Sequence, residues 1–396
     1  LLSPEARALT RPYFEVLIVD SVSEQQERWL RNNVSRMRRL EDPFTYEAVV
    51  VPSLEDALIA VLFNHNIQAI VVLPGLVLKS GLDNEILHSF LNRAGGSEAI
   101  DAMQPEDYGP ELCRLIGRVR PELDAYLVTE RSVEDIAGLD LGICRRVFYN
   151  QEDFLELHLN ILRGVEARYK TPFFTALVNY SKQPTGVFHA MPISRGKSIT
   201  RSHWIQDMGA FYGPNIFLAE TSATSGGLDS LLEPHGPIKE AQELASRAFG
   251  SKQTFFATNG TSTCNKIVVQ ALVRPGDIVL VDRDCHKSHH YGMVLAGAEV
   301  VYLDSYPLNE YSMYGAVPLR EIKHQLLALK AAGKLDRVRM LLLTNCTFDG
   351  LVYNVERVME ECLAIKPDLI FLWDEAWFAF ARFNPTYRQR TGMNAA

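Results

Sequence analysis

Cysteine pairs, long apolar runs and a leader sequence are all missing from this sequence of 396 residues. Its six cysteines include no C-x-x-C pair, as expected of reduced thiols in the cytosol rather than of a disulfide framework. No apolar run approaches the length of about 18 residues that a membrane span requires. The N-terminus also lacks the basic-then-apolar order of a signal peptide. These absences predict a cytoplasmic protein that does not act at a membrane.

Positive charge is also scarce. The chain has 40 Lys and Arg against 48 Asp and Glu, which gives a formal net charge of -8. Nucleic acids and anionic membranes select for clustered Lys and Arg, so this balance argues against a nucleic-acid partner and favours a small molecule or another protein. Hydrophobic residues make up 47% of the chain, and at roughly 150 residues per domain the length predicts two or three domains.

The N-terminal third alternates strand and helix patterns. Apolar runs such as "VLIVD" and "QAIVVLP" are strand-like, and Ser53 with Asp56 forms a helix-start signal before the second run. We therefore expect a small open parallel sheet and assign residues 1–125 to one domain. "VLIVD" resembles a phosphorylation receiver domain, which is flavodoxin-like, with Asp20 as its acid. Pro74 stands where the phosphoacceptor Asp should close the later strand, so a structural or assembly role is favoured.

Residues 126–171 differ from the regions on either side. The stretch from 93 to 135 mixes Gly, Pro and charged residues, and the helix-like segment "EDFLELHLNILRGVEARY" follows it. This composition predicts a domain boundary and a connecting arm over residues 126–171.

From residue 172 to residue 396, apolar runs of buried-strand length alternate with helix patterns. The expected strands are "QTFFATNG", "DIVLVD", "EVVYLD", "VRMLLLTN" and "DLIFLWDEA". Such alternation predicts an α/β domain with a doubly wound, mostly parallel sheet. In sheets of this kind, ligands gather at the carboxyl ends of the strands.

Two strand ends carry residues suited to a charged ligand. Gly260 leads into a helix that begins with Thr261 and Ser262. Free backbone N–H groups, hydroxyls and the positive end of a helix dipole suit a phosphate, although Ser and Thr are also ordinary helix caps. Asp374 directly follows four apolar residues, where a carboxylate is unfavourable unless it meets a cation or several donors. The alternative for Asp374 is a cap for a following helix.

The stretch "DRDCHKSHHYG" ends a third strand and admits several interpretations. A zinc site would use Cys285, His286, His289 and His290. Adjacent Cys285 and His286 do not readily converge on one ion, and His289 and His290 point in different directions around a helix, so we expect no metal. Lys287 as a Schiff-base lysine has no support beyond its neighbours, and a solvated cation at a helix start is the simpler interpretation.

A phosphate-binding helix start, an imidazole and a strand-end carboxylate together describe a phosphorylated pyridine as the ligand. The sequence resembles the pyridoxal-phosphate enzymes of fold type I, specifically the bacterial ornithine/lysine/arginine decarboxylase family with its receiver-like N-terminal wing domain. The resemblance extends over nearly the whole chain. It is densest in "LAETSATSGGLDSLLEPHGPIKEAQ", "TNGTSTCNKIVVQALVRPGD", "DRDCHKSHHYG", "LTNCTFDGL" and "WDEAWFAFARF".

The resemblance implies a pyridoxal-phosphate-binding large domain over residues 172–396, in which several residues contact the cofactor. They are Thr261 and Ser262 with the Gly260 backbone at the phosphate, His286 stacked on the pyridine, Asp374 at its nitrogen, and Ala376 and Trp377 at or near the opposite face. Asp374 would keep the pyridine protonated, and a protonated ring is the electron sink that decarboxylation requires. His289, His290 and Lys287 are neighbours without an assigned role.

Two features depart from the family pattern. Family members carry the cofactor-binding lysine in a Ser-x-His-Lys element downstream of the Asp, and none follows Asp374 here. We therefore expect the chain to be the N-terminal portion of a longer enzyme, with its large domain incomplete at the C-terminal end. The loop "VFHAMPISRGKS" replaces a "TPGH"-like loop, although His189, Arg195 and Lys197 keep it polar. Lysine, ornithine and arginine all stay open as substrates.

The leading hypothesis is pyridoxal-phosphate-dependent decarboxylation of a basic amino acid to a polyamine-type amine, by a homodimer or a larger homo-oligomer. One alternative is another reaction of the same cofactor, such as transamination or side-chain cleavage, because groups that bind the ring do not decide which bond breaks. The other is a non-catalytic assembly or regulatory protein that lacks the lysine.

Overall fold

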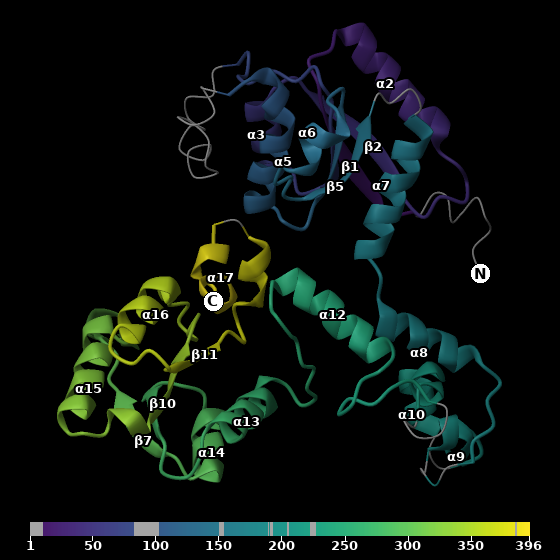
Figure 1. Ribbon diagram of the computed structural model, residues 1–396. Helices are drawn as coiled ribbons and strands as arrows, with labels where there is room; N and C mark the ends of the chain where they lie inside the picture. The colour runs from purple at the N-terminus through teal and green to yellow at the C-terminus, as the bar shows by residue number, and fades with distance from the viewer. Residues whose placement is uncertain are drawn as a thin grey trace. The chain divides into compact units, whose positions relative to one another are not determined.

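The computed structural model describes residues 11–82, 103–149, 154–188, 190, 193–203, 206–221, 227–384 and 386–396. The chain divides into two compact units, Leu1–Lys170 and Thr171–Ala396, each built on its own parallel sheet (Figure 1). No helix within these described ranges combines the length and the hydropathy of a membrane span.

The first unit is a five-stranded parallel sheet with the order β2-β1-β3-β4-β5, which is the order of flavodoxin-like folds. Helices α3 and α5 cover one face, and α2 and α7 cover the other (Figure 1). Both faces are therefore buried, as the continuous apolar runs of the strands require. The elements are β1 (Tyr13–Val19), α2 (Glu24–Met37), β2 (Thr45–Val51), α3 (Leu54–Phe63), β3 (Ile67–Val72), η2 (Pro105–Asp107), α5 (Tyr108–Val119), β4 (Asp124–Thr129), α6 (Val133–Ala137), β5 (Cys144–Tyr149) and α7 (Phe154–Arg168).

Strand β5 and helix α7 correct the predicted domain boundary. Leu157, Ile161 and Val165 of α7 are buried in the core of the first sheet, and β5 pairs with β4 at the sheet edge. The prediction of a connecting arm over residues 126–171 was therefore wrong, and the division lies between Lys170 and Thr171. The physical reason is that a helix needs only one apolar face to pack against a sheet. The mixed composition of the neighbouring turns suggested a linker, although α7 has such a face.

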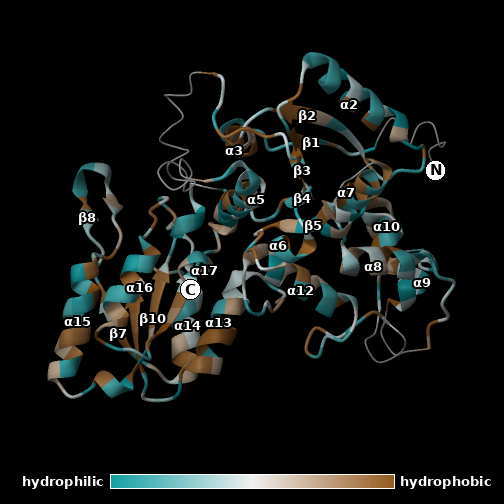
Figure 2. Ribbon diagram, turned by 45° about the horizontal axis from the view of Figure 1, so that its top comes forward, coloured by the Kyte–Doolittle hydropathy of each residue, from teal (hydrophilic) through white to brown (hydrophobic). Residues whose placement is uncertain are grey.

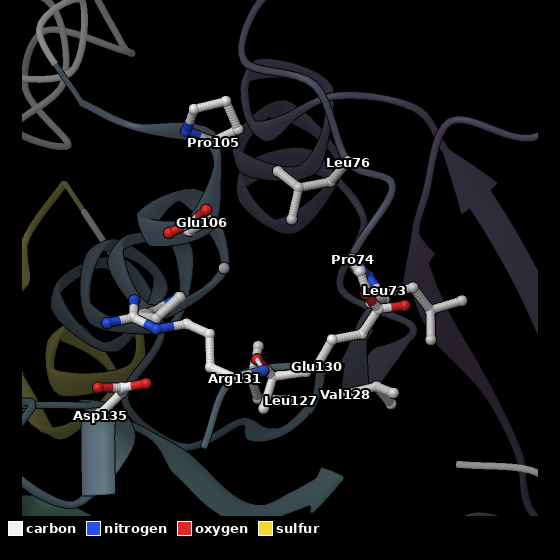
Figure 3. Close-up of a pocket in the computed structure, with 13 residues that line it drawn as sticks. Leu73, Pro74, Leu76, Pro105, Glu106, Leu127, Val128, Glu130, Arg131 and Asp135 are labelled. Atoms are coloured by element: carbon white, nitrogen blue, oxygen red, sulfur yellow. Dashed lines mark hydrogen bonds between the residues drawn. The ribbon is translucent and has the colours of Figure 1, made fainter. Parts of the chain in front are cut away.

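A cavity of about 510 Å³ opens at the carboxyl ends of β3 and β4. Figure 3 shows Leu73 and Pro74 on one side of it and Glu106 and Asp135 on the other. Pro74, at the position where a receiver was expected to carry its phosphoacceptor, lies two residues after the end of β3 and lines this cavity. Asp20 directly follows the last residue of β1, and burial raises the pKa of its carboxyl. The role of the first unit in assembly stays a prediction.

Three buried polar side chains form a chain inside the first unit. The hydroxyl of Tyr46 lies 2.8 Å from Nδ1 of His158, and Nε2 of His158 lies 3.6 Å from Asp42. Burial lowers the pKa of His158 below its ordinary value, and the attraction of Asp42 only partly offsets this. The folded unit therefore favours a neutral imidazole at this position.

We expect the free energy of unfolding of the first unit to fall as the pH drops below about 6.5, the pKa of an unperturbed histidine. Below this pH the unfolded chain binds a proton at His158 more readily than the folded unit does. The stabilising contribution of neutral His158 is therefore complete above the pKa of the unfolded chain, and it is lost as the pH falls through the lower pKa of the folded unit. Urea unfolding on either side of this pH would measure it, with His158→Gln as the comparison. An equal pH dependence in the variant would contradict this assignment.

The second unit contains a four-stranded parallel sheet with the order β11-β10-β6-β7. Helices α13 and α14 pack on one face, and α15 and α16 pack on the other; the central strand β10 is coloured hydrophobic in Figure 2. The predicted doubly wound sheet is confirmed. Its strands are β6 (Ile278–Asp282), β7 (Glu299–Leu303), β10 (Val338–Thr344) and β11 (Ile370–Asp374), with a separate hairpin of β8 (Pro307–Leu308) and β9 (Met313–Tyr314).

The helices of the second unit include all those predicted between the strands. They are α8 (Pro172–Lys182), α9 (Lys197–Thr200), α10 (Gln206–Tyr212), α11 (Asn215–Leu218), α12 (Pro237–Phe249), α13 (Thr261–Leu272), α14 (Lys287–Ala296), α15 (Leu319–Ala331), α16 (Val355–Leu363) and α17 (Gly392–Ala395). Short 3-10 turns are η3 (Ser194–Gly196), η4 (Asn309–Tyr311), η5 (Leu335–Arg337), η6 (Ala379–Phe383) and η7 (Arg388–Arg390).

The segment "QTFFATNG" before α13 was predicted as a strand and is not one. A strand needs a hydrogen-bonded neighbour, and no strand in the described part of the chain pairs with residues 253–260. Phe255 is 74% exposed, so the apolar pattern that suggested a buried strand lies at the surface. The parallel sheet therefore ends at β11 and at β7.

Candidate functional site

The start of α13 is the first element of the site. The backbone passes through two positive φ angles, 66° at Asn259 and 73° at Gly260, before the helix begins at Thr261. No side chain caps this helix, and the first N–H groups of any helix lack intrahelical partners. Thr261 is exposed and Ser262 is half-buried. The predicted helix start is present, and free N–H groups at such a helix start are the donors that an anion can use.

His286 is the N-cap residue of α14, as Gly260 is of α13. Its Nδ1 accepts a hydrogen bond from the backbone N–H of Ser288 at 3.2 Å and lies 2.8 Å from Oγ of the same serine. Because a backbone N–H can only donate, Nδ1 is the acceptor in this hydrogen bond. His286 is exposed. The cap therefore fixes the orientation of the imidazole while the side chain stays accessible.

Gly292 allows α13 and α14 to approach each other closely. A Cβ atom at Gly292 would lie 3.3 Å from Cβ of Val269 and 3.4 Å from Cα of Lys266, so a larger residue would push the helices apart. This approach brings Nδ2 of Asn265 within 3.1 Å of Oγ of Ser288. Since α13 precedes β6 and α14 follows it, both helices begin at the carboxyl edge of the sheet.

Asp374 ends β11 at this same edge and is 6% exposed. Its Oδ2 accepts hydrogen bonds from Nε2 of His289 at 2.8 Å and from Nδ2 of Asn265 at 3.1 Å. Its Oδ1 accepts one from the N–H of Ala376 at 3.2 Å. Burial by itself raises the pKa of Asp374, but these donors, His289 foremost, outweigh burial and hold the pKa below its usual value. The buried carboxylate is therefore ionised, and Oδ1 retains capacity for a further donor.

One chain of hydrogen bonds joins His286 to Asp374. It runs from Nδ1 of His286 to Oγ of Ser288, then to Nδ2 of Asn265, and finally to Oδ2 of Asp374. Thr261 lies one helical turn before Asn265, about 6 Å along the axis. The structure thus brings the two helix starts and the strand-end carboxylate into one region.

Ala376 and Trp377 lie on the exposed loop that follows β11. Trp377 is 68% exposed, and its ring centroid lies 6.2 Å from that of Phe348. Glu375 fixes the path of this loop, because its carboxylate accepts hydrogen bonds from Asn345 at 2.6 Å and from the N–H of Gly392 at 2.7 Å. Cofactor contacts of Ala376 and Trp377 remain predictions.

The altered loop before α9 is held by Arg195. The guanidinium of Arg195 is buried and donates to the carbonyl oxygens of Tyr180 and Gln183 at 3.0 Å each. Arg195 therefore supports the backbone of this segment rather than offering a free charge to a substrate. Lys197 is exposed at the start of α9, and His189 lies outside the described residues.

The remaining residues of "DRDCHKSHHYG" have separate partners. Nε2 of His290 lies 3.5 Å from Sγ of Cys285, and Nδ1 lies 3.3 Å from the hydroxyl of Tyr302. Burial raises the pKa of Cys285 to about 12, which disfavours the thiolate that a metal would bind. Among the residues that the structure describes, no three His, Cys, Asp or Glu side chains form a group that could hold a metal ion. Lys287 is the exposed first residue of α14.

His289 and Asn265 contact Asp374, and the sequence reasoning assigned a role to neither of them. Asn265 lies four residues after Thr261, and His289 lies three residues after His286. Residues with these spacings share one face of a helix. That helical spacing is the signal that could have identified them.

Residues 171–396 match the family model for the Orn/Lys/Arg decarboxylase major domain. Among the relatives, lysine decarboxylase LdcA of Pseudomonas aeruginosa is 36% identical over an alignment of 301 positions that covers 72% of this chain and 40% of that protein. The biodegradative arginine decarboxylase of Escherichia coli is 28% identical over an alignment of 404 positions that covers 96% of this chain and 48% of that protein. The chain spans less than half the length of these two relatives.

Solved structures agree with this match. Lysine decarboxylase A from Pseudomonas aeruginosa superposes with a TM-score of 0.53 at 28% identity, over 97% of this chain and 50% of that one. The lysine decarboxylase of Francisella novicida, at 23% identity and a TM-score of 0.52 over 97% of this chain and 49% of that one, shows the same fold. The predicted fold class is confirmed. Because the family model covers more than half of its residues, this chain belongs to the Orn/Lys/Arg decarboxylase family.

Proposed function

We propose that the intact protein catalyses decarboxylation of a basic amino acid with pyridoxal phosphate, releasing carbon dioxide and an amine. Membership of the family implies pyridoxal phosphate as the cofactor. The observation that carries the proposal is Asp374, a buried carboxylate held ionised at the carboxyl end of β11, beside the starts of α13 and α14. Relatives named as lysine, arginine and ornithine decarboxylases support a basic amino acid as the substrate class.

The described residues fit a phosphorylated pyridine. The start of α13 offers the N–H groups and hydroxyls of Thr261 and Ser262 to a phosphate, where the helix dipole favours negative charge. The accessible imidazole of His286, fixed by its cap, offers a face on which an aromatic ring can stack. Asp374 offers an ionised oxygen to a protonated ring nitrogen. These three contacts differ in chemistry, so together they select for one kind of ligand.

When it is bound, pyridoxal phosphate supplies an electron sink for the carbanion that remains after carbon dioxide leaves. Asp374 would hold a proton on the ring nitrogen, because its negative charge stabilises a neighbouring cation in a buried site. His286 would shield one face of the ring from water, and the start of α13 would anchor the phosphate. Each of these tasks needs only the side chains and N–H groups that the described residues provide.

Carboxyl-labelled lysine, ornithine and arginine would test this function. With the intact protein and added pyridoxal phosphate, we expect release of labelled carbon dioxide from at least one of the three. A keto acid without labelled carbon dioxide would instead indicate transamination. No product from any of them would favour a non-catalytic assembly or regulatory protein.

Replacement of Lys287 by Met is expected to leave the absorbance of the bound cofactor unchanged. Lys287 is exposed at the first position of α14, and the cap of that helix comes from His286 rather than from its own side chain. Absorbance titration of both proteins with pyridoxal phosphate would measure the difference. Loss of the cofactor spectrum in the variant would show that this lysine binds the cofactor.

The proposal includes a homodimer or a larger homo-oligomer. Tyr291, Val294 and Leu295 of α14 are 55%, 78% and 64% exposed, and their spacing places them on one face of the helix. Association of two copies would remove such apolar surface from water. Light scattering after size-exclusion chromatography measures the mass in solution, and a monomer at micromolar concentration would contradict this part.

A further inference from the structure

The side chain of His289 has one hydrogen-bond partner in the described part of the chain, and it has no contact with solvent. It is 0% exposed, and its Nε2 lies 2.8 Å from Oδ2 of Asp374. Its Nδ1 is buried without a hydrogen-bond partner in the described part of the chain, which is uncommon for a buried polar atom. Because an unpaired buried nitrogen is unfavourable, packing alone would favour an apolar residue here. The hydrogen bond to Asp374 is the compensating interaction that the structure shows.

Asn265, the other side-chain donor to Asp374, has a second task. Its Nδ2 donates to Oδ2 of Asp374 and to Oγ of Ser288, at 3.1 Å in both cases. Asn265 therefore links the carboxylate to the His286 cap. The side chain of His289 makes no such link, because among the described residues its only hydrogen bond goes to Asp374.

The charges of the groups around Asp374 also indicate that His289 stabilises this carboxylate. Among the described residues, Cys285, which precedes α14, and Glu375, the next residue in the chain, also interact electrostatically with this carboxylate. Burial raises the pKa of Cys285 to about 12, so its thiol is neutral. Burial also raises the pKa of Glu375, which is itself an acid. Within the described ranges, His289 is the one side chain that can form an ion pair with Asp374.

We propose that His289 is a positioning residue for the cofactor, whose Nε2–H holds Asp374 ionised and in one orientation toward the ring nitrogen. This inference rests on the proposed function, because it presupposes a pyridine cofactor. His289 contacts neither cofactor nor substrate and acts through Asp374.

Two probes separate this role from a merely structural one. The first is an analogue of pyridoxal phosphate without the aldehyde, which binds the site but cannot bond to a lysine. The second is the same analogue with a carbon atom in place of the ring nitrogen. Only the first probe can use the contact with Asp374, while both carry the same phosphate. Affinities are measured by calorimetry on the intact protein, for His289→Leu, His289→Gln and the control His290→Leu.

His289→Leu is expected to weaken binding of the nitrogen probe by at least about tenfold, the effect of losing a charge-assisted hydrogen bond, and to leave binding of the carbon probe unchanged. His289→Gln keeps an N–H donor and should retain most of the affinity. His290→Leu should change neither affinity, because His290 contacts Cys285 and Tyr302 instead. Loss of the His289 hydrogen bond should raise the pKa of Asp374. As the pH is lowered, the leucine variant should therefore begin to lose affinity for the nitrogen probe at a higher pH than the wild type does.

Three results would overturn the inference. One is equal affinity of the wild type and the leucine variant for the nitrogen probe. Another is an equal loss of affinity for both probes in the leucine variant, which would mean that His289 only supports the fold. The third is a glutamine variant as weak as the leucine variant, and the glutamine variant also keeps the test valid if leucine prevents folding. A wild type that binds neither probe would instead overturn the proposed function, and this inference with it.

Discussion

Asp374→Asn is expected to lower the decarboxylation rate of the intact protein by at least about a hundredfold, the usual effect of removing one electrostatic contact to a reacting group. An amide has no negative charge and cannot hold a proton on the ring nitrogen. The donors from His289 and Asn265 would also meet a weaker acceptor. The rate at saturating substrate and the affinity for pyridoxal phosphate should both fall, while circular dichroism should show an unchanged fold.

Asp282 offers a matched control for this experiment. It ends β6, is 2% exposed, and accepts hydrogen bonds from the N–H of Asp284 and the hydroxyl of Ser305. Asp282→Asn therefore removes a second buried carboxylate at a strand end without touching Asp374. Burial already raises the pKa of Asp282, so an uncharged amide should be tolerated and turnover should stay near that of the wild type. Near-normal turnover in Asp374→Asn would contradict the proposed role of Asp374.

Ser262→Asp is expected to abolish binding of pyridoxal phosphate without loss of stability. A carboxylate in the first turn of α13 interacts favourably with the helix dipole, so the free energy of unfolding should stay constant or rise by up to about 1 kcal/mol. The same carboxylate would accept the N–H groups proposed for the phosphate and would repel that phosphate at short distance. The effects on stability and on binding therefore have opposite signs, which excludes misfolding as the cause.

Ser262→Asn is the control that separates the effect of the added negative charge from the effect of the larger side chain. Asn is nearly the same size as Asp, but it is neutral. It should reduce the affinity for pyridoxal phosphate only slightly, as followed by absorbance titration. An Asp variant that binds as tightly as the wild type would place the phosphate elsewhere.

Much of the fold follows from local sequence patterns. Alternating apolar runs and helix patterns predicted both parallel sheets, and Ser53 caps α3 through the N–H of Asp56 as expected. The burial of Asp374 was also predictable, because an unbroken run of apolar residues directly precedes it. These features depend on periodicity and on neighbours in sequence, which a single chain displays directly.

Other features depend on contacts between distant residues. The bond between His289 and Asp374 joins residues 85 positions apart, and helical spacing alone does not reveal its partner. The docking of α7 on the first sheet likewise depends on tertiary packing, which its flanking turns did not suggest. Residues 253–260 have the composition of a strand, but a strand forms only where a neighbour completes its hydrogen bonds.

Crystals of the intact protein with pyridoxal phosphate would test the central claim most directly. The account predicts the phosphate at the start of α13, against Thr261 and Ser262, with the ring nitrogen within hydrogen-bond distance of Asp374 and the ring beside His286. Density for the phosphate at another helix start, or a ring nitrogen facing solvent while Asp374 bonds only to His289, Asn265 and Ala376, would contradict it.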